Sequence, residues 1–81
     1  MTYITKFFAK IATMKEIYFA KNLTNLRKTQ KITQAQLAKT LGVDQRTISA
    51  WEKGVCEPNF TMLAKICEVF GETFDSILTE F

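Results

Sequence analysis

Histidine is absent from this chain of 81 residues, and cysteine occurs only twice. Without His, the chain lacks the commonest general base at neutral pH and a frequent zinc ligand. Cys56 and Cys67 alone cannot assemble a zinc site or a Cys-His nucleophile, and we expect both to be free thiols in a reducing compartment. There is also no Gly-rich phosphate loop and no cluster of carboxylates. We therefore expect no metal, no cofactor and no enzymatic activity.

Long apolar runs are missing as well. The longest uninterrupted run covers residues 17–20, far below the roughly 18 residues that a membrane-spanning helix needs. Lys6, Lys10 and Lys15 interrupt the N-terminal apolar stretch, which leaves no continuous core for a secretory signal. These absences predict a cytoplasmic protein without a membrane partner.

The composition that remains is that of one small folded domain. Hydrophobic residues make up 47% of the chain and charged residues 23%, so the chain can bury a core. A second core would need roughly another 50 residues or more. We expect a single domain over residues 20–81 and a separate N-terminal extension over residues 1–19.

Charge is distributed unevenly along the chain. Residues 1–19 carry a net charge of +2, residues 20–53 carry +5 and residues 54–81 carry −4, which together give the overall +3. A basic central segment suggests a polyanionic partner, although a run of charges is more often a solvated face.

Glycine is scarce and regularly placed. Each of the three glycines follows a segment with helical apolar spacing, where Gly can take the left-handed conformation that ends a helix. Side chains able to cap the next helix follow at Asp44, Asn59 and Thr73, and Thr33 and Gln36 fit a capping box. Apolar residues recur every three or four positions, and no β-type alternation persists. The sequence therefore predicts an all-α, compact five-helix domain with helices over 20–30, 34–41, 45–53, 60–70 and 74–80.

Residues 34–54, QAQLAKTLGVDQRTISAWEKG, place two of these helices on either side of a tight turn. Gly42 permits the sharp bend between them, and apolar residues such as Leu41 and Ile48 can lock the two helices together. The short motifs Leu-Ala, Leu-Gly-Val, Ile-Ser and Trp-Glu-Lys-Gly occur together in this segment. Their combination at this spacing is a far more specific signal than a helical hairpin alone.

With these motifs, residues 20–79 resemble the lambda-repressor-like, or Cro/C1-type (XRE family), helix-turn-helix domains. The likeness includes Leu26-Arg27, Pro58 and the run over residues 63–66. It implies a cytoplasmic five-helix protein that binds an operator sequence, is frequently a homodimer and controls transcription. Such proteins often belong to phages, mobile elements or toxin–antitoxin loci. The family pattern assigns nothing to the N-terminal extension.

The resemblance also implies site residues. Gln34 stands where the family holds a DNA phosphate at the start of the second helix, and Asn59 stands where members often touch the DNA backbone. The predicted base-reading residues are Gln45, Arg46, Ser49 and Ala50, and the predicted backbone contacts are Gln34, Thr47, Lys53 and Asn59.

Helical geometry favours the same face independently. If Ile48 and Trp51 point inward, the opposite stripe of this helix is polar and has no apolar residue larger than Ala50. In a major groove, Arg can bind guanine and Gln can bind adenine through two hydrogen bonds, and Ala can approach a thymine methyl. The alternative is an ordinary solvated helix face, which is also the simplest account of the lysines at 28, 31 and 39.

Two further predictions concern architecture. The family pattern, together with Glu52 as the only glutamate in the basic segment 20–53, leads us to expect an internal ion pair between Arg27 and Glu52, the alternative being a solvent-exposed Glu52. We also expect the C-terminal helix to offer more apolar surface than it can hide against its own domain, so that it forms a dimer interface. The predicted interface residues are Phe74, Ile77, Leu78 and Phe81.

The extension over residues 1–19 carries an amphipathic stripe of Ile4, Phe7, Phe8 and Ile11. We expect it to pack against the domain or against a second subunit. Alternatively, Met14 is the natural start, and the first 13 residues are an upstream extension.

These observations predict a homodimeric DNA-binding transcriptional regulator, a repressor that blocks polymerase at a palindromic operator. One alternative is an antitoxin that binds both double-stranded DNA and a toxin protein. Another is a protein-interaction module that has kept the fold and lost DNA binding.

Overall fold

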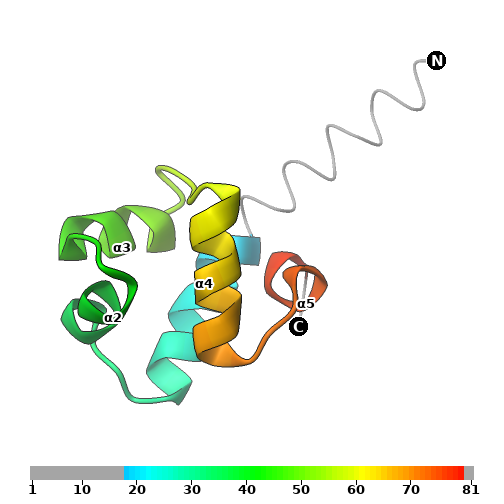
Figure 1. The fold of residues 1–81 in the computed structure, drawn as a ribbon, viewed down its shortest axis with the longest axis horizontal. Coiled ribbons are helices and arrows are strands. Elements are labelled where there is room, and N and C mark those ends of the chain that lie inside the picture. The colour runs from blue at the N-terminus through cyan, green and yellow to red at the C-terminus, as the bar shows by residue number, and fades with distance from the viewer. Residues whose placement is uncertain (1–17, 80–81) are drawn as a thin grey trace.

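Five helices account for most of residues 18–79, the part of the chain that the computed structural model describes (Figure 1). The first helix is described over residues 18–29. It is followed by α2 (Gln34–Leu41), α3 (Gln45–Glu52), α4 (Phe60–Phe70) and α5 (Phe74–Leu78). No strand occurs within this range. The all-α prediction is confirmed. The largest differences are that the first helix includes Tyr18 and the buried Phe19, which the prediction assigned to the N-terminal extension, and that α5 ends at Leu78 instead of residue 80.

The turn between α2 and α3 is built as its residues suggest. Gly42 adopts φ 73°, and its backbone N–H donates to the carbonyl of Lys39. The N–H of Val43 donates to the carbonyl of Ala38, which satisfies a second carbonyl at the end of α2. Asp44 then accepts a hydrogen bond from the Arg46 backbone N–H at 2.8 Å and starts α3. Short-range chemistry thus sets the angle between the two helices.

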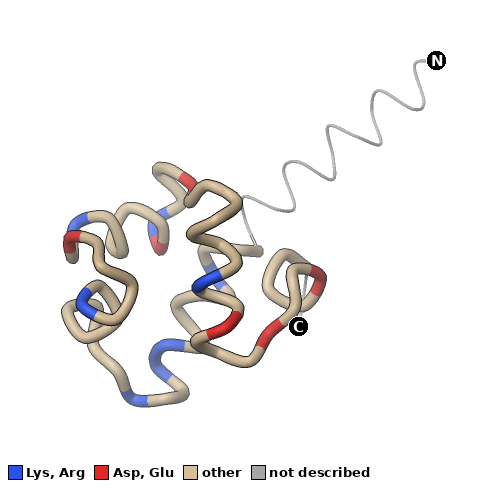
Figure 2. The backbone as a smooth tube through the Cα atoms, viewed as in Figure 1, with Lys and Arg blue, Asp and Glu red and all other residues tan. Residues whose placement is uncertain are grey.

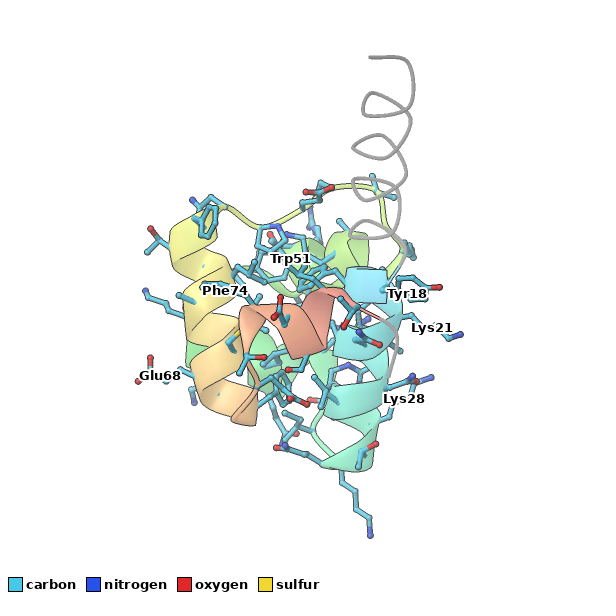
Figure 3. All side chains as sticks on the ribbon, turned by 90° about the vertical axis from the view of Figure 1, so that its right-hand side faces the viewer. Tyr18, Lys21, Lys28, Trp51, Glu68 and Phe74 are labelled. Carbon is cyan, nitrogen blue, oxygen red and sulfur yellow. The ribbon has the colours of Figure 1, made fainter. Side chains whose placement is uncertain are left out.

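The core lies where all five helices meet. Leu23 of the first helix, Ile48 of α3, Ile66 of α4 and Ile77 of α5 are fully buried. Trp51, near the end of α3, lies in the interior of the domain (Figure 3). Each such side chain stabilises the fold by roughly 1.5–3 kcal/mol relative to its exposed state.

Asn22 is buried among these apolar residues, with an exposed fraction of 3%. Its side-chain amide donates to the backbone carbonyls of Ile77 at 3.0 Å and Thr79 at 2.7 Å. These carbonyls belong to the end of α5, where a helix has no internal partners for them. Asn22 therefore ties α5 to the first helix, a role that sequence patterns did not reveal.

The burial of Ile77 corrects the predicted dimer interface. Its side chain is fully covered within its own domain, so it cannot contribute to a contact with a second subunit. Leu78 is half-buried and packs against the core, and Phe74 remains 40% exposed. Phe81, like the predicted stripe of the N-terminal extension, lies outside the described residues.

The first helix ends without a glycine. Lys31 takes the left-handed conformation at φ 58°, and the N–H of Ile32 donates to the carbonyl of Arg27 at 3.1 Å. A side chain in this conformation costs roughly 1–2 kcal/mol, which Gly would avoid.

The two cysteines differ in environment. Cys56 is an exposed free thiol in the loop after α3, and Cys67 is a buried one in α4. Burial, with a smaller contribution from Glu72, raises the pKa of the Cys67 thiol, which makes it a poor nucleophile. None of the helices in the described range combines the length and apolar character needed to cross a membrane.

Candidate nucleic-acid interface

The outward face of α3 is polar and accessible. Gln45 and Arg46 are exposed in its first turn, and Ser49 and Ala50 are half-buried one turn later. The buried pair on the opposite side, Ile48 and Trp51, fixes which face of the helix points outward. All four predicted base-reading residues therefore lie together on one helix.

A shallow hollow joins this face to the start of α2. It is lined by Gln34, Asp44, Gln45, Arg46 and Ser49. The predicted phosphate contact at Gln34 thus lies beside three of the predicted base-reading residues, although it is 11 positions away from Gln45 in the sequence.

The electrostatics of this hollow favour an anionic ligand. The N-termini of α2 and α3 both lie at it, and helix N-termini carry a partial positive charge that adds to the guanidinium of Arg46. The lining contains one acidic side chain, Asp44, and its carboxylate is engaged as the cap of α3.

The side chain of Gln34 is hydrogen-bonded to a buried ion pair. Arg27 Nε lies 2.7 Å from Glu52 Oε2, and Arg27 also donates from Nη2 to Glu52 Oε1 at 3.1 Å. The side chains are only 13% and 7% exposed, so the ion pair is internal, as the sequence suggested. The Gln34 amide donates to the same Glu52 Oε1 at 3.1 Å. The network thus connects the first helix, α2 and α3.

Burial alone would raise the pKa of Glu52. The hydrogen bonds from Arg27 and Gln34, together with the positive charge of Arg27, outweigh burial and hold the pKa below its usual value. The ion pair also raises the already high pKa of Arg27. Both groups are therefore charged at neutral pH.

The other predicted backbone contacts lie outside this hollow. Lys53 is exposed at the C-terminal end of α3, and Thr47 is half-buried within that helix. Asn59 caps α4, where its side-chain oxygen accepts from the Met62 backbone N–H at 2.8 Å, so only its NH2 group could donate to a phosphate.

Charge is segregated on the surface of the domain (Figure 2). Four of the six acidic residues between positions 18 and 79 lie on α4, on α5 or in the loops that precede them, at Glu57, Glu68, Glu72 and Asp75. Lys21 and Lys28 lie along one outer side of the first helix (Figure 3), and neither residue lines the hollow.

Sequence reasoning missed the link between Gln34 and Glu52. A pairwise search for opposite charges could find Arg27 and Glu52 but not a neutral amide as third member.

Among residues 18–79, no group of three or more His, Cys, Asp or Glu is arranged to hold a metal ion.

Comparison with known proteins assigns this arrangement to a family. The Helix-turn-helix family model matches residues 23–77. The chain is 39% identical over 61 residues to the HTH-type transcriptional activator BcrR of Enterococcus faecalis, which covers 75% of this chain and 30% of that protein. It is 30% identical over 60 residues to the antitoxin PezA of Streptococcus pneumoniae, covering 74% and 38%. The chain thus spans about a third of the length of these two relatives.

Solved structures show the same fold. The SOS-response transcriptional repressor LexA of Eubacterium rectale superposes with a TM-score of 0.77 at 23% identity, over 82% of this chain and 70% of that one. The hydroxypropylphosphonic acid epoxidase of S. wedmorenis superposes with a TM-score of 0.68 at 34% identity. That likeness covers 74% of this chain but only 32% of the epoxidase chain.

Proposed function

The chain belongs to the helix-turn-helix family, and from this premise we propose that it is a transcriptional regulator that binds double-stranded DNA through α3. The observation that carries the proposal is the grouping of Gln34, Gln45, Arg46 and Ser49 around one hollow at the N-termini of α2 and α3. A phosphate contact and base contacts must lie side by side in this way if one helix enters a major groove.

The roles divide by chemistry. Arg46 projects from the first turn of α3 and would hold a guanine edge through two hydrogen bonds, and Gln45 would hold an adenine. Ser49 and Ala50 lie one turn deeper and would contact the neighbouring base pair. Lys53, at the C-terminal end of α3, would neutralise the charge of a phosphate.

Gln34 would contact a phosphate in an orientation set by the protein. Its amide nitrogen has two hydrogens, and one of them is directed to Glu52 Oε1 at 3.1 Å. That contact leaves the second hydrogen for a phosphate oxygen. The ion pair between Arg27 and Glu52 would therefore serve binding as well as stability.

We further propose that the protein acts as a homodimeric repressor on a palindromic operator. The exposed Phe74 of α5 supports a contact between subunits on this side of the domain. Two-fold symmetry then places half-site centres roughly 34–36 Å apart, about one turn of DNA. Occupation of a promoter by such a dimer would exclude polymerase. Repression of this kind needs neither catalysis nor a cofactor. We propose that the protein acts in the cytoplasm.

Selection of bound duplexes from a random pool tests the proposal. Wild-type protein should enrich two inverted half-sites with the spacing given above, and binding should weaken steeply as salt rises. The double variant Gln45→Ala, Arg46→Ala is the matched control and should enrich no motif. Recovery of random sequence by the wild type, without salt-sensitive binding, would favour the interaction module that has lost DNA binding.

The identity to the antitoxin PezA supports a second candidate function. An antitoxin would bind DNA and also neutralise a toxin protein. Co-expression with the product of the adjacent gene should then relieve growth arrest caused by that product and yield a stable complex. If the product of that gene still arrests growth when both proteins are expressed, the antitoxin function is refuted and the DNA-binding regulator alone remains.

A further inference from the structure

We propose that residues 1–17 of one copy of the chain dock in an apolar hollow beside α4 and α5 of a second copy. The inference rests on the proposed dimer and supplies a partner for a surface that DNA recognition does not use.

This apolar hollow shares no lining residue with the polar hollow at the start of α2 and α3. It is lined by Phe19, Glu57, Pro58, Phe60, Leu63 and Leu78. Phe60 is 79% exposed, and its ring packs edge-to-face on the ring of Phe74, with centroids 5.5 Å apart. Two neighbouring aromatic rings that remain exposed beside an apolar hollow are typical of a surface that binds another protein segment.

The chain itself contains a segment that matches this hollow. Seventeen residues precede Tyr18, the neighbour of the hollow-lining Phe19. Ile4, Phe7, Phe8 and Ile11 recur in this segment at helical spacing, so a helix formed by these residues would have one apolar face. An apolar stripe of this size needs an apolar surface to cover it.

Charge complementarity favours the same pairing. Residues 1–17 carry three lysines and one glutamate, a net charge of +2. Residues 54–79, which include α4, α5 and the acidic hollow-lining residue Glu57, carry one lysine and four acidic residues, a net charge of −3. Glu57 is the one charged residue that lines the hollow, and the opposite net charges of the two segments would steer their association.

The position of Phe19 favours a second copy over the same copy. Because Phe19 forms part of the wall, a segment that ends one or two residues before it would have to reverse direction at once to enter its own hollow. None of the residues that favour tight turns, namely Gly, Pro, Asn, Asp and Ser, occurs before Asn22. Exchange between two copies needs no reversal, and two-fold symmetry gives each hollow one segment.

The natural thiol of Cys56 allows a direct test. Cys56 is exposed and adjoins Glu57 and Pro58 in the wall of the hollow, whereas the second thiol, Cys67, is buried. In the full-length Ala9→Cys variant, a short bismaleimide should join position 9 of one copy to Cys56 of the other. The expected product is a covalent dimer on a denaturing gel. Wild-type protein and the Ala9→Cys, Cys56→Ser variant are the controls, and both should remain largely monomeric on the gel.

A matched pair of substitutions checks that the hollow is the docking surface. Phe60→Ser should weaken dimerisation about tenfold or more, because it removes the most exposed ring of the site. Val55→Ser alters a side chain that is 76% exposed but does not line the hollow, and it should leave dimerisation unchanged. Both sites are on the surface, so both variants should fold.

Each other outcome overturns the inference. A crosslink within one chain would place the segment in its own hollow, and the absence of any crosslink would place it elsewhere. If the wild type nevertheless sediments as a dimer at micromolar concentration, the proposed dimer stands and only the docking fails. A monomeric wild type would overturn both, while selection of an operator from the random pool would still support DNA binding.

Discussion

Replacement of Glu52 by glutamine should cost the domain about 3 kcal/mol of stability. In the structure, Arg27 makes two contacts with the Glu52 carboxylate, at 2.7 and 3.1 Å, and both side chains are largely buried. Removal of one partner of a buried ion pair costs about 3–5 kcal/mol, because the other charge remains buried and unpaired. We take the lower end because the introduced amide keeps one acceptor and because Arg27 also donates to the Ile32 carbonyl at 2.9 Å.

Urea unfolding measures this cost. With a denaturant slope of about 1–1.5 kcal/mol per molar for so small a domain, the unfolding midpoint of Glu52→Gln should fall by about 2–3 M. The exposed Glu68 offers a control, since Glu68→Gln removes the same charge and should change stability by less than about 0.5 kcal/mol. A Glu52→Gln protein with the wild-type midpoint would refute the argument.

The same pair predicts how stability depends on pH. Because the fold lowers the pKa of Glu52 from 4.5, folding favours its charged form. Its contribution is therefore fully present above the unfolded pKa and is lost as pH falls through the lower, folded pKa. Wild-type protein should lose stability below about pH 4.5, and Glu52→Gln should show a smaller loss over this range. Urea midpoints measured across this range test the sign.

The remaining predictions concern single contacts. Asn22→Ala should lower the free energy of unfolding by about 1–3 kcal/mol, because it removes the hydrogen-bond donor to the carbonyls at the end of α5. Asn25→Ala, on the exposed side of the same helix, should have little effect. Equal urea midpoints for the two variants would contradict this prediction. Lys31→Gly should stabilise the domain by about 1 kcal/mol by relieving a positive φ, and a lower melting temperature would show that no strain is stored there. Gln34→Ala should weaken binding to all duplexes alike. Lys53→Ala should reduce the slope of log affinity against log salt concentration by nearly 2 in a symmetric dimer. An unchanged slope would show that Lys53 does not contact DNA.

The helices and the turn could be predicted because short-range chemistry specifies them. Gly42, Asp44 and the capping box of Thr33 act within a few residues of themselves, so the sequence shows both partners of each interaction. The ion pair could be predicted because a family pattern and a Glu isolated among basic residues pointed to it.

Other features depend on partners far away in the sequence. Asn22 bonds carbonyls more than 50 residues away, and backbone carbonyls leave no trace in side-chain patterns. The end of the first helix at Lys31 carries no glycine to mark it. Ile77 was assigned to a dimer interface because apolar spacing shows that a face is buried but not whether its own domain or another chain buries it.

The central claim is that α3 of this protein recognises bases, and the base preferences of Arg46→Ala test it most directly. Affinities of wild type and variant should be measured at fixed salt on the selected duplex and on every single-base substitution of it. We predict that Arg46→Ala loses about 1–3 kcal/mol on the selected duplex and loses its preference at one guanine position in each half-site, while other positions keep theirs. An equal loss of affinity for the selected duplex and for scrambled DNA would assign Arg46 to the phosphate backbone and contradict base recognition by this residue.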